Sequence, residues 1–483
     1  MKYKAERKII AGKLKFSAGF HIGTGDADDW IDSTIVKTKD DKPFIPGTTL
    51  AGIFRNLAEE HISDKKSISG LFGSTDNNGS ASRIIFCDSF STGTPELWYR
   101  NGVGIKRDTL TARDKALFSL EIASRSEFDF RIIIDNPQEE DMNIIAPILA
   151  EMQSGRVVIG GDKSRGLGWA TLSDLKHADI KLDATEIDEF INYLVENKMS
   201  FQELKVDNLA KTGDGIDANH IAIEYTLSLD DIDASLIVSS GIPGFSKDAD
   251  NTVMRDGMKG EFFIPGSSIK GPIRAQAEKI LRYLNKNACD PTDRDKSCSA
   301  KISKVKKGNN IDCSKKDIVE KYSCPICKIF GNGYLASKIF FTDAYETNEQ
   351  KSQVIENVAI DRFTGGGLEG AKFNTEVATK VNLKGRIILK KLTQEQTALI
   401  AFTLRDWLEG DIRLGFGKMK GYGRCKIQLD KINLCAKDDN WLKKRIEDGW
   451  GKKGFYNTKV IDNTQFSGYM GKIGQLKLEV AQL

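Results

Sequence analysis

The alternation of apolar and polar residues predicts a compact series of strands and helices early in the chain. Residues 12–22, GKLKFSAGFHI, alternate as a half-buried strand does. After the IPG motif at 45–47, apolar residues recur with helical spacing. Further strands are predicted at 83–90, 127–134 and 156–161, and a second helix at 139–152. The order strand, helix, strands, helix, strand indicates an α+β domain of the ferredoxin-like kind.

The same pattern returns in the second half of the chain. Five blocks recur in one order, so a duplicated domain explains them better than chance. The pairs are 45–55 with 264–274, 71–90 with 329–345, the segments starting at Gly104 and Ala359, 139–155 with 393–410, and 160–170 with 415–425. We therefore expect two tandem domains of the same fold, which the length of 483 residues also favours.

The spacing of the blocks gives the domain boundaries. Corresponding residues are 219 apart at the IPG motif and 258 apart at Leu71 and Ile329, so the second copy contains 39 additional residues. The expected organisation is a first domain, a helical linker, a second domain with an insertion, and an extension without a counterpart. In order, these are 1–180, 181–218, 219–435 with the insertion at about 282–328, and 436–483.

The insertion contains five of the eight cysteines of the chain. Cys324 and Cys327 form a C-P-I-C motif, whose spacing lets two thiolates face one metal ion. We expect a structural zinc site formed by these two with Cys289 and Cys298, leaving Cys313 as the spare. The alternative is a redox C-x-x-C pair, although no thioredoxin-like strand precedes it.

Two glycine-rich loops end the two copies, GGDKSRGLG at 160–168 and GFGKMKGYG at 415–423. Glycines let backbone amides approach a phosphate closely, and basic side chains lie beside them. The candidate phosphate contacts are Lys163, Arg165, Lys418 and Lys420. The alternative is a tight structural turn with solvated lysines. Neither a Walker A motif nor a dinucleotide fingerprint is complete here.

Each IPG motif is followed by hydroxyl residues and then by basic ones. We expect Thr48 or Thr49 to cap the first helix, and the helix starts to offer amides to an anion. Arg55, Lys270 and Arg274 add positive charge for phosphate contacts.

Long charged segments beginning at Gly104 and Ala359 separate two strands of each copy. Loops of this length are often functional. Each contains a phenylalanine shortly before a glutamate, Phe118 and Phe373. These rings are suited either to wedge between bases or to cap the core.

Acidic residues, not histidines, recur before the IPG motifs. Asp32 lies 14 residues before Pro46, and Asp250 lies 15 residues before Pro265. An aspartate beside a phosphodiester can bind a divalent cation or help activate a 2′-hydroxyl. The alternative is a solvated acidic loop. None of the four histidines recurs, so twin histidine-based sites are not expected.

Composition adds the cellular setting. A formal net charge of +3 neither favours nor excludes a nucleic-acid partner, because clustering of charge decides that. Charges interrupt the N-terminal segment too often for a signal peptide, and no apolar run has the length of a membrane span. We expect a cytoplasmic protein with no membrane partner.

These motifs together resemble the RAMP-superfamily backbone subunit of type III CRISPR–Cas effector complexes. The matching stretches include HIGTG, IDSTIV, IPGTTLAG and GGDKSRGLG in the first copy, and IPGSSIKG, CPICKIFG, AIDRFTGGG and GFGKMKGYG in the second. The joined pair is similar to the fused two-copy subunit of type III-D variant complexes.

The resemblance implies ferredoxin-like (RRM-like) domains that bind guide RNA and target single-stranded RNA among other effector subunits, including neighbouring backbone subunits. It implies thumb hairpins around Arg107 and Arg362 and a zinc-binding insertion in the second copy. It also implies target cleavage with Mg²⁺ or Mn²⁺ by an aspartate that matches Asp32. Asp250 occupies the second position, where the following serine is replaced by Asn251.

Lys270 matches the family's lysine, which Ala51 replaces in the first copy. Three alternatives stay open: a guide-RNA scaffold without catalysis, an endoribonuclease that processes guide precursors, and a protein that binds small nucleotides.

Overall fold

The computed structural model describes most of both repeats. The described residues are 6–62, 64–75, 79–181, 191–193, 195, 199–206, 220–229, 251–256, 260–309, 316–347 and 351–435. They divide into two compact units. The first unit contains 1–99, 119–163 and 167–217, and the second contains 100–118, 164–166 and 218–483. Two short pieces of the first repeat thus belong to the second unit.

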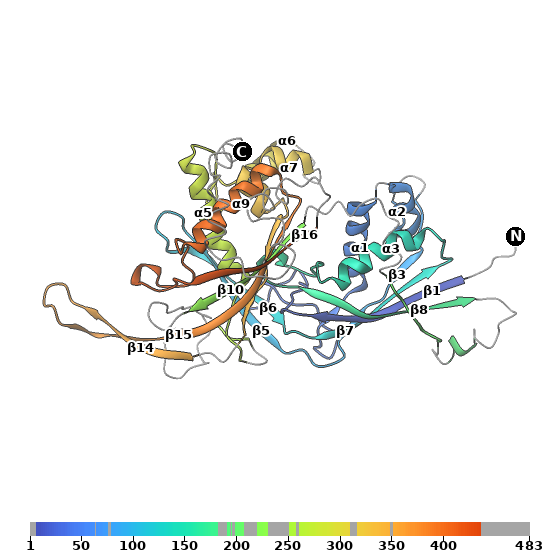
Figure 1. The fold of residues 1–483 in the computed structure, drawn as a ribbon, viewed down its shortest axis with the longest axis horizontal. Coiled ribbons are helices and arrows are strands. Elements are labelled where there is room, and N and C mark those ends of the chain that lie inside the picture. Colours follow the sequence, from blue (N-terminus) through green and yellow to red (C-terminus); the bar gives the residue numbers. More distant parts are fainter. Residues whose placement is uncertain are drawn as a thin grey trace. The chain divides into compact units, whose positions relative to one another are not determined.

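The first unit is built on an antiparallel sheet in the order β3-β7-β1-β8-β9 (Figure 1). Its strands are β1 (Glu6–Phe16), β3 (Ile84–Phe86), β7 (Glu127–Asp135), β8 (Ala170–Lys181) and β9 (Gln202–Glu203). Numbered along the chain, the first four strands follow the order 2-3-1-4, which is the ferredoxin-like arrangement. The α+β prediction is therefore confirmed, and the repeat uses the strand order that its element sequence indicates.

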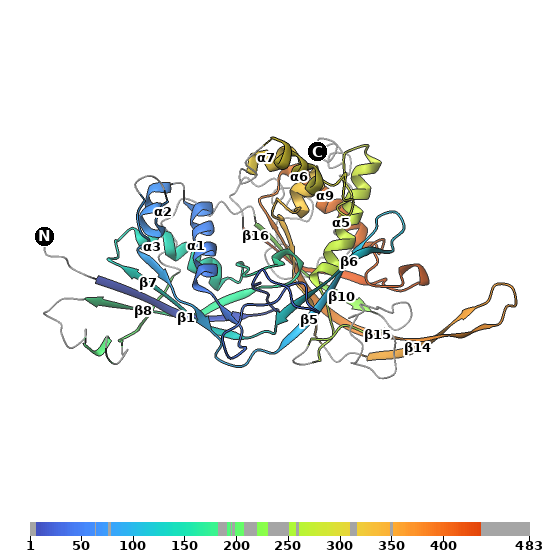
Figure 2. The same cartoon turned by 180° about the vertical axis from the view of Figure 1, so that it is seen from behind.

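Three helices lie on one face of this sheet (Figures 1 and 2). They are α1 (Gly47–His61), α2 (Lys65–Phe72) and α3 (Asp141–Gln153). The sheet turns alternate residues toward them: Ile10 of β1 is paired with Ile132 of β7, and Leu14 with Phe128. All four side chains are fully buried with Phe54 of α1. Strand alternation and the helical apolar stripe thus close one hydrophobic core.

The second unit repeats this plan with additions. Strands β12, β15, β10 and β16 pair in that order, again 2-3-1-4 along the chain. Their bounds are β10 (His220–Leu229), β12 (Ile339–Phe341), β15 (Gly367–Lys390) and β16 (Lys426–Cys435), with helices α5 (Gly266–Tyr283) and α9 (Gln394–Leu408). The insertion forms α6 (Cys298–Asn309), α7 (Lys316–Lys321) and α8 (Pro325–Phe330). Short strands β2 (Phe44–Ile45), β4 (Ser89–Phe90), β11 (Phe263–Ile264) and β13 (Ala344–Glu346) flank the two IPG helices.

The long charged segments of both repeats are hairpins. The first is β5 (Leu97–Ile105) with β6 (Ala112–Ala123), and the second is β14 (Lys351–Ile360) with β15. The second hairpin projects far from α5 and α9 of its own unit (Figures 1 and 2). Hairpins at both positions agree with the thumbs that the family resemblance implies.

Two details differ from the sequence-based expectations. Pro46 and Pro265 are the N-caps of α1 and α5, and neither helix start receives a side-chain cap from a hydroxyl. Because proline offers no side-chain acceptor, the amide of Gly47 instead donates to Asp88 Oδ1 at 2.7 Å. In the same way, Gly266 donates to Asp343 Oδ1 at 2.8 Å.

The strands expected immediately before the glycine loops are absent. Residues 156–161 contribute only the bridge of Val158 to Trp169, and 411–416 form no strand. The last strand of each repeat follows its glycine loop instead, since the loop turns the chain into the sheet. The expected linker helix at 184–197 falls largely outside the described residues. None of the helices in the described ranges has the length and hydrophobicity of a membrane span.

Candidate nucleic-acid interface and metal centre

Asp32 lies on the loop between β1 and β2 with its side chain exposed. Its Oδ2 accepts hydrogen bonds from the amide of Ser119 at 2.7 Å and from Ser119 Oγ at 3.2 Å. The amide of Asp32 in turn donates to Ser119 Oγ at 3.1 Å. These bonds orient the carboxylate through one oxygen, which leaves Oδ1 facing solvent for a cation or an RNA hydroxyl.

A buried glutamate, Glu121, fixes this loop through hydrogen bonds and an ion pair. Glu121 is 2 % exposed; its Oε2 accepts from the amide of Ile35 at 2.9 Å, and its Oε1 pairs with Lys37 Nζ at 2.7 Å. His21 connects Glu121 to the same loop: its Nδ1 donates a hydrogen bond to the backbone carbonyl of Glu121 at 2.7 Å. Since a carbonyl only accepts, the other ring nitrogen of neutral His21 accepts from Ser33 Oγ at 3.1 Å. Ser33 immediately follows Asp32.

The second repeat holds its loop in the same way. Glu376 Oε2 accepts from the amide of Val253 at 3.2 Å, and its Oε1 pairs with Arg255 at 2.9 Å. The amide of Glu376 donates to the carbonyl of Asn251 at 2.8 Å, as that of Glu121 does to Ser33 at 3.1 Å. Asn251 is therefore the counterpart of Ser33, in agreement with the sequence alignment. Asp250 itself lies outside the described residues.

The two glutamates were missed by sequence reasoning, although the signal was present. SLEIAS in the first repeat aligns with NTEVAT in the second, so the glutamate recurs within an already recognised block. Its role was hidden because the loop that it holds is far away in the chain. Only the folded backbone brings the two segments together.

The glycine loops are tight turns at equivalent places. Gly168 and Gly423 have φ of +80° and +84°, and a Cβ there would lie 2.0 Å from Ile159 O and 1.9 Å from Leu414 O, respectively. Both positions therefore require glycine for a structural reason. The first alternative considered for these loops, a structural turn, is thus part of their role.

The basic residues of the two loops take matching positions. Arg165 lies over the ring of Phe118 at 5.7 Å, and Lys420 lies over the ring of Phe373 at 5.0 Å. Desolvation lowers the pKa of Lys163 and of Lys418, and the positive charge of Arg107 lowers that of Lys418 further. Each loop thus has one lysine whose pKa is lowered and a second cation beside an aromatic ring.

Other predicted RNA contacts are engaged within the protein. Lys270 donates to Ser164 Oγ at 2.7 Å and to Ser337 Oγ at 3.1 Å. Arg107 and Arg274 meet on the buried carboxylate of Glu278, at 2.8 and 2.9 Å. By contrast, Arg55 is an exposed cation on α1 paired with Glu59 at 3.2 Å, and Arg362 is exposed at the turn of the β14–β15 hairpin.

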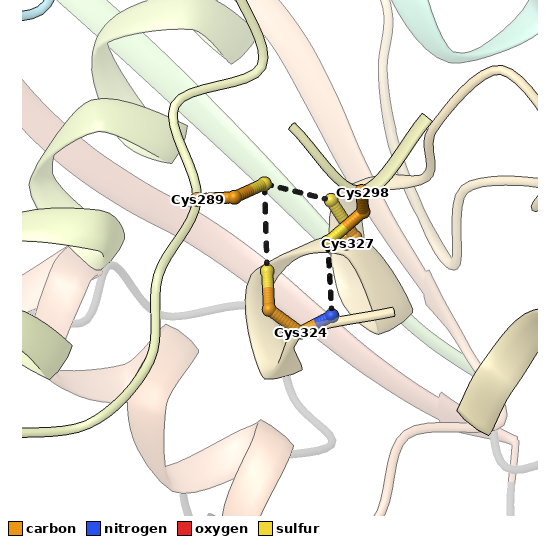
Figure 3. A group of neighbouring side chains, drawn as sticks. All are labelled: Cys289, Cys298, Cys324 and Cys327. Carbon is orange, nitrogen blue, oxygen red and sulfur yellow. Dashed lines mark hydrogen bonds between the residues drawn. The ribbon is translucent and has the colours of Figure 1, made fainter. Parts of the chain in front are cut away.

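Four cysteines of the insertion converge in a buried cluster (Figure 3). Their sulfur atoms all lie within 4.8 Å of one another, and none is in a disulfide. They come from the chain before α6, the start of α6, the N-cap of α8 and its first turn: Cys289, Cys298, Cys324 and Cys327. Cys313 lies outside the described residues.

The chemistry of this cluster suits a metal with soft ligands. Hydrogen bonds among the thiols lower the pKa of Cys298 and Cys324 and raise that of Cys289 and Cys327. Arg274 donates to Cys327 Sγ at 3.4 Å, and its positive charge opposes the rise in the pKa of Cys327. Four convergent thiols without a disulfide are the ligand set of a structural zinc site. Asp406, Glu409 and Asp411 form a second group of neighbouring acidic residues. Both carboxylate oxygens of Asp406 already accept hydrogen bonds, from Gln276 and Arg405.

Comparisons with known proteins agree with this arrangement. The RAMP superfamily matches residues 13–171 and 212–426. CRISPR system Cms endoribonuclease Csm3 of Streptococcus thermophilus is 31 % identical over 200 residues, covering 34 % of this chain and 89 % of the relative. Csm3 of Methanocaldococcus jannaschii is 29 % identical over 203 residues, covering 38 % of this chain and 69 % of the relative. One such relative therefore corresponds to about one repeat.

Proposed function

Because the chain belongs to the RAMP superfamily, we propose that it is a guide-RNA-binding backbone subunit of a type III CRISPR effector complex. In this role it would hold a guide–target RNA duplex and cut the target strand. Its partners would be the guide RNA, the target RNA and other effector subunits, neighbouring backbone subunits among them. The two-copy chain would supply two consecutive backbone positions, as the resemblance to fused type III-D subunits implies.

The nuclease proposal depends mainly on the exposed carboxylate of Asp32, which is oriented by hydrogen bonds to one of its two oxygens. Ser119 orients Oδ2, so Oδ1 can reach a reacting group without moving the loop. Mg²⁺ or Mn²⁺ bound there would stabilise charge that develops on the phosphate during cleavage. Alternatively, the carboxylate would accept the proton of the 2′-hydroxyl as its oxygen attacks phosphorus. In that reaction the 2′-O–P bond forms, the P–O5′ bond breaks, and the 5′-oxygen leaves as a hydroxyl after taking a proton from water.

Guide binding would depend on phosphate contacts, with sequence choice left to base pairing. The glycine loops support this assignment because Lys163 and Lys418 lie at equivalent places in the two repeats. The first lysine, the cation beside an aromatic ring and the backbone amides of each turn would form one anion-binding unit. The four clustered cysteines would hold zinc, whose chemistry here is structural crosslinking of the insertion.

A non-catalytic scaffold is the second candidate for the second repeat, and a specific observation favours it. Asn374 replaces Ser119, and Asn251 replaces Ser33, at the positions that orient the aspartate in the first repeat. The serine hydroxyl that donates to the carboxylate in the first repeat is thus replaced by a carboxamide in the second. Asp250 would then be an inactive counterpart of Asp32.

Target cleavage by the assembled, guide-loaded complex tests both candidates. We expect Asp32→Asn to remove one product band without weakening target binding. Asp29→Asn is the matched control, since Asp29 is an exposed aspartate of the same loop. Asp250→Asn distinguishes a second nuclease site, which would lose another band, from a scaffold, which would lose none. Survival of all bands in the Asp32→Asn/Asp250→Asn double variant would contradict the proposal. Cleavage that stops in EDTA would favour the metal route, and cleavage that persists in EDTA would favour the general-base route.

A further inference from the structure

A buried carboxylate of the second unit binds the turn of the β5–β6 hairpin, whose residues 100–118 belong to this unit. Glu278 of α5 is fully buried, and its two oxygens accept from two different arginines. Oε2 accepts from Arg107 Nε of the hairpin at 2.8 Å, and Oε1 accepts from Arg274 Nε at 2.9 Å. A buried carboxylate held in this way fixes both arginines, because loss of either one leaves part of its charge uncompensated.

Arg274 reaches the cysteine cluster with the rest of its guanidinium. Its Nη2 donates to Cys327 Sγ at 3.4 Å, and its Nη1 donates to the carbonyl of Gly331, directly after α8, at 3.1 Å. One planar group, only 12 % exposed, thus binds the carboxylate of α5, a cysteine sulfur and the end of α8. Hydrogen bonds from neighbouring side chains orient metal ligands. Cys327 and Glu278 are therefore placed by the same side chain.

A second connection runs from the same carboxylate to the cluster. Arg282 Nη2 lies 3.6 Å from Glu278 Oε2 and donates to the carbonyl of Ala288 at 3.2 Å. Ala288 immediately precedes Cys289, another of the clustered cysteines. Glu278 is thus linked to two of the four cysteines through two arginines.

The first repeat shows the same ion pair without an insertion beside it. Arg55 and Glu59 of α1 occupy the positions of Arg274 and Glu278 and pair at 3.2 Å. Their side chains are 44 % and 56 % exposed, and an exposed pair of this kind contributes little to stability. Burial of the pair is therefore a property of the second repeat, where the cysteine insertion follows the helix.

We propose that Arg274 is a positioning residue that couples the four-cysteine metal centre to the β5–β6 hairpin by way of Glu278. When Cys327 is a metal ligand, its sulfur is a fixed acceptor for Arg274, which orients Glu278 and through it Arg107. Loss of the metal would free the sulfur and loosen the hairpin. This inference rests on the zinc assignment of the proposed function, and it gives Arg274 a role inside the protein in place of a phosphate contact.

The test measures zinc affinity and hairpin opening in the full, RNA-free chain. Competition with a chromophoric chelator gives the affinity. Hydrogen exchange at the Lys106 amide, which donates to the carbonyl of Thr111 at 2.9 Å, reports opening of the hairpin. In wild type, zinc should slow this exchange by roughly fivefold or more, the lower end of ordinary coupling between two sites.

Reciprocity gives the sharper measurement, because a hairpin that depends on the metal must also strengthen metal binding. We expect Arg107→Met to weaken zinc binding by about fivefold or more, although Arg107 binds Glu278 rather than a cysteine. Lys106→Met removes the same charge one residue away and is the matched control. Its zinc affinity should equal that of wild type.

Arg274→Lys separates the coupling from the charge. Lysine keeps the positive charge, but one ammonium nitrogen cannot bind Glu278, Cys327 and Gly331 together as the guanidinium does. We expect zinc binding about 10–100-fold weaker, as for loss of other groups that orient metal ligands. At saturating zinc, exchange at Lys106 should be as fast as in the zinc-free wild type.

Two results would overturn the coupling and leave the metal assignment standing: hairpin exchange in wild type that zinc does not change, or equal zinc affinity in wild type and Arg107→Met. The wild-type comparison needs no substitution, so it decides the question even if Arg107→Met does not fold. A chain that binds no zinc would overturn both the coupling and the metal assignment. Target cleavage by Asp32 is measured separately and can fail alone.

Discussion

Single carboxylates organise both aspartate loops. Glu121 and Glu376 each accept one loop amide and pair with one cation two residues further along. A buried carboxylate with both oxygens engaged fixes its surroundings, because any opening leaves an unpaired charge. If Asp32 cuts RNA as proposed, its placement would depend on the buried Glu121, which holds the loop.

We expect Glu121→Gln to loosen the loop that contains Asp32. The substitution removes the charge partner of Lys37, and hydrogen bonds to charged groups contribute about 1.5–3 kcal/mol. Hydrogen exchange should show faster exchange at Ile35, and the Asp32-dependent product should form about tenfold or more slowly. The product assigned to the second repeat is the internal control. Unchanged exchange at Ile35 would show that Glu121 does not hold the loop.

The shifted lysines predict a pH dependence of guide binding. Burial lowers the pKa of Lys163 and Lys418, so each loses its charge at a lower pH than an ordinary lysine. Guide affinity should therefore fall as pH rises toward about 10.4, the usual lysine value. The double variant Lys163→Arg/Lys418→Arg should bind with a flatter profile, since arginine stays protonated. Equilibrium binding of guide RNA across pH, at one ionic strength, measures this dependence. Identical pH profiles for wild type and the double variant would show that Lys163 and Lys418 do not contact the guide.

At the scale of elements, the glycine loops close each domain. Each loop returns the chain to the sheet through a crossing in which only hydrogen fits at Gly168 or Gly423. The turn that brings backbone amides and lysines together is thus the turn that the last strand requires. The proposed phosphate contacts would therefore use residues of a turn that the fold itself requires.

Gly423→Ala should destabilise the second unit strongly. Its Cβ would meet Leu414 O at 1.9 Å, at a φ of +84°. Gly421→Ala is the matched control, with a φ of +95° and nothing within 4 Å of its Cβ. The control should lose about 1–2 kcal/mol from the left-handed conformation alone. Gly423→Ala should lose a further 1–3 kcal/mol, roughly, from overlap. Denaturant unfolding monitored in the second unit compares the two variants. Equal losses in the free energy of unfolding would show that the close approach of Gly423 to Leu414 O does not restrict the side chain at position 423.

The insertion elements should depend on zinc. Helices α6 to α8 are short, and the four clustered cysteines lie in α6 and α8 or in the chain that precedes them, so metal ligation would supply much of the stability of the insertion. Elemental analysis should find one zinc per chain in wild type, and Cys327→Ser should lose it. Cys87→Ser should keep it, because Cys87 is outside the cluster and desolvation raises its pKa. A wild-type chain purified without zinc that keeps a protease-resistant insertion would contradict a structural metal.

At the scale of the whole molecule, the two sequence repeats do not coincide with the two compact units. Residues 100–118 of the first repeat belong to the second unit, where Arg107 and Arg100 pair with Glu278 and Asp343. The tip of the first repeat's hairpin is thus held by the IPG helix and the following segment of the second repeat.

The sequence by itself determined the repeat, the α+β order of each copy, the cysteine set and the place of Asp32. These follow from patterns along the chain: periodicity, recurrence and short spacings. Only the tertiary structure decided that Glu121 reaches Ile35 across 86 residues and that Arg107 reaches Glu278 across 171. It also decided that aspartates, not threonines, take the first amides of the IPG helices. Such contacts join segments distant in sequence, and their geometry exists only once the sheet has set which faces meet.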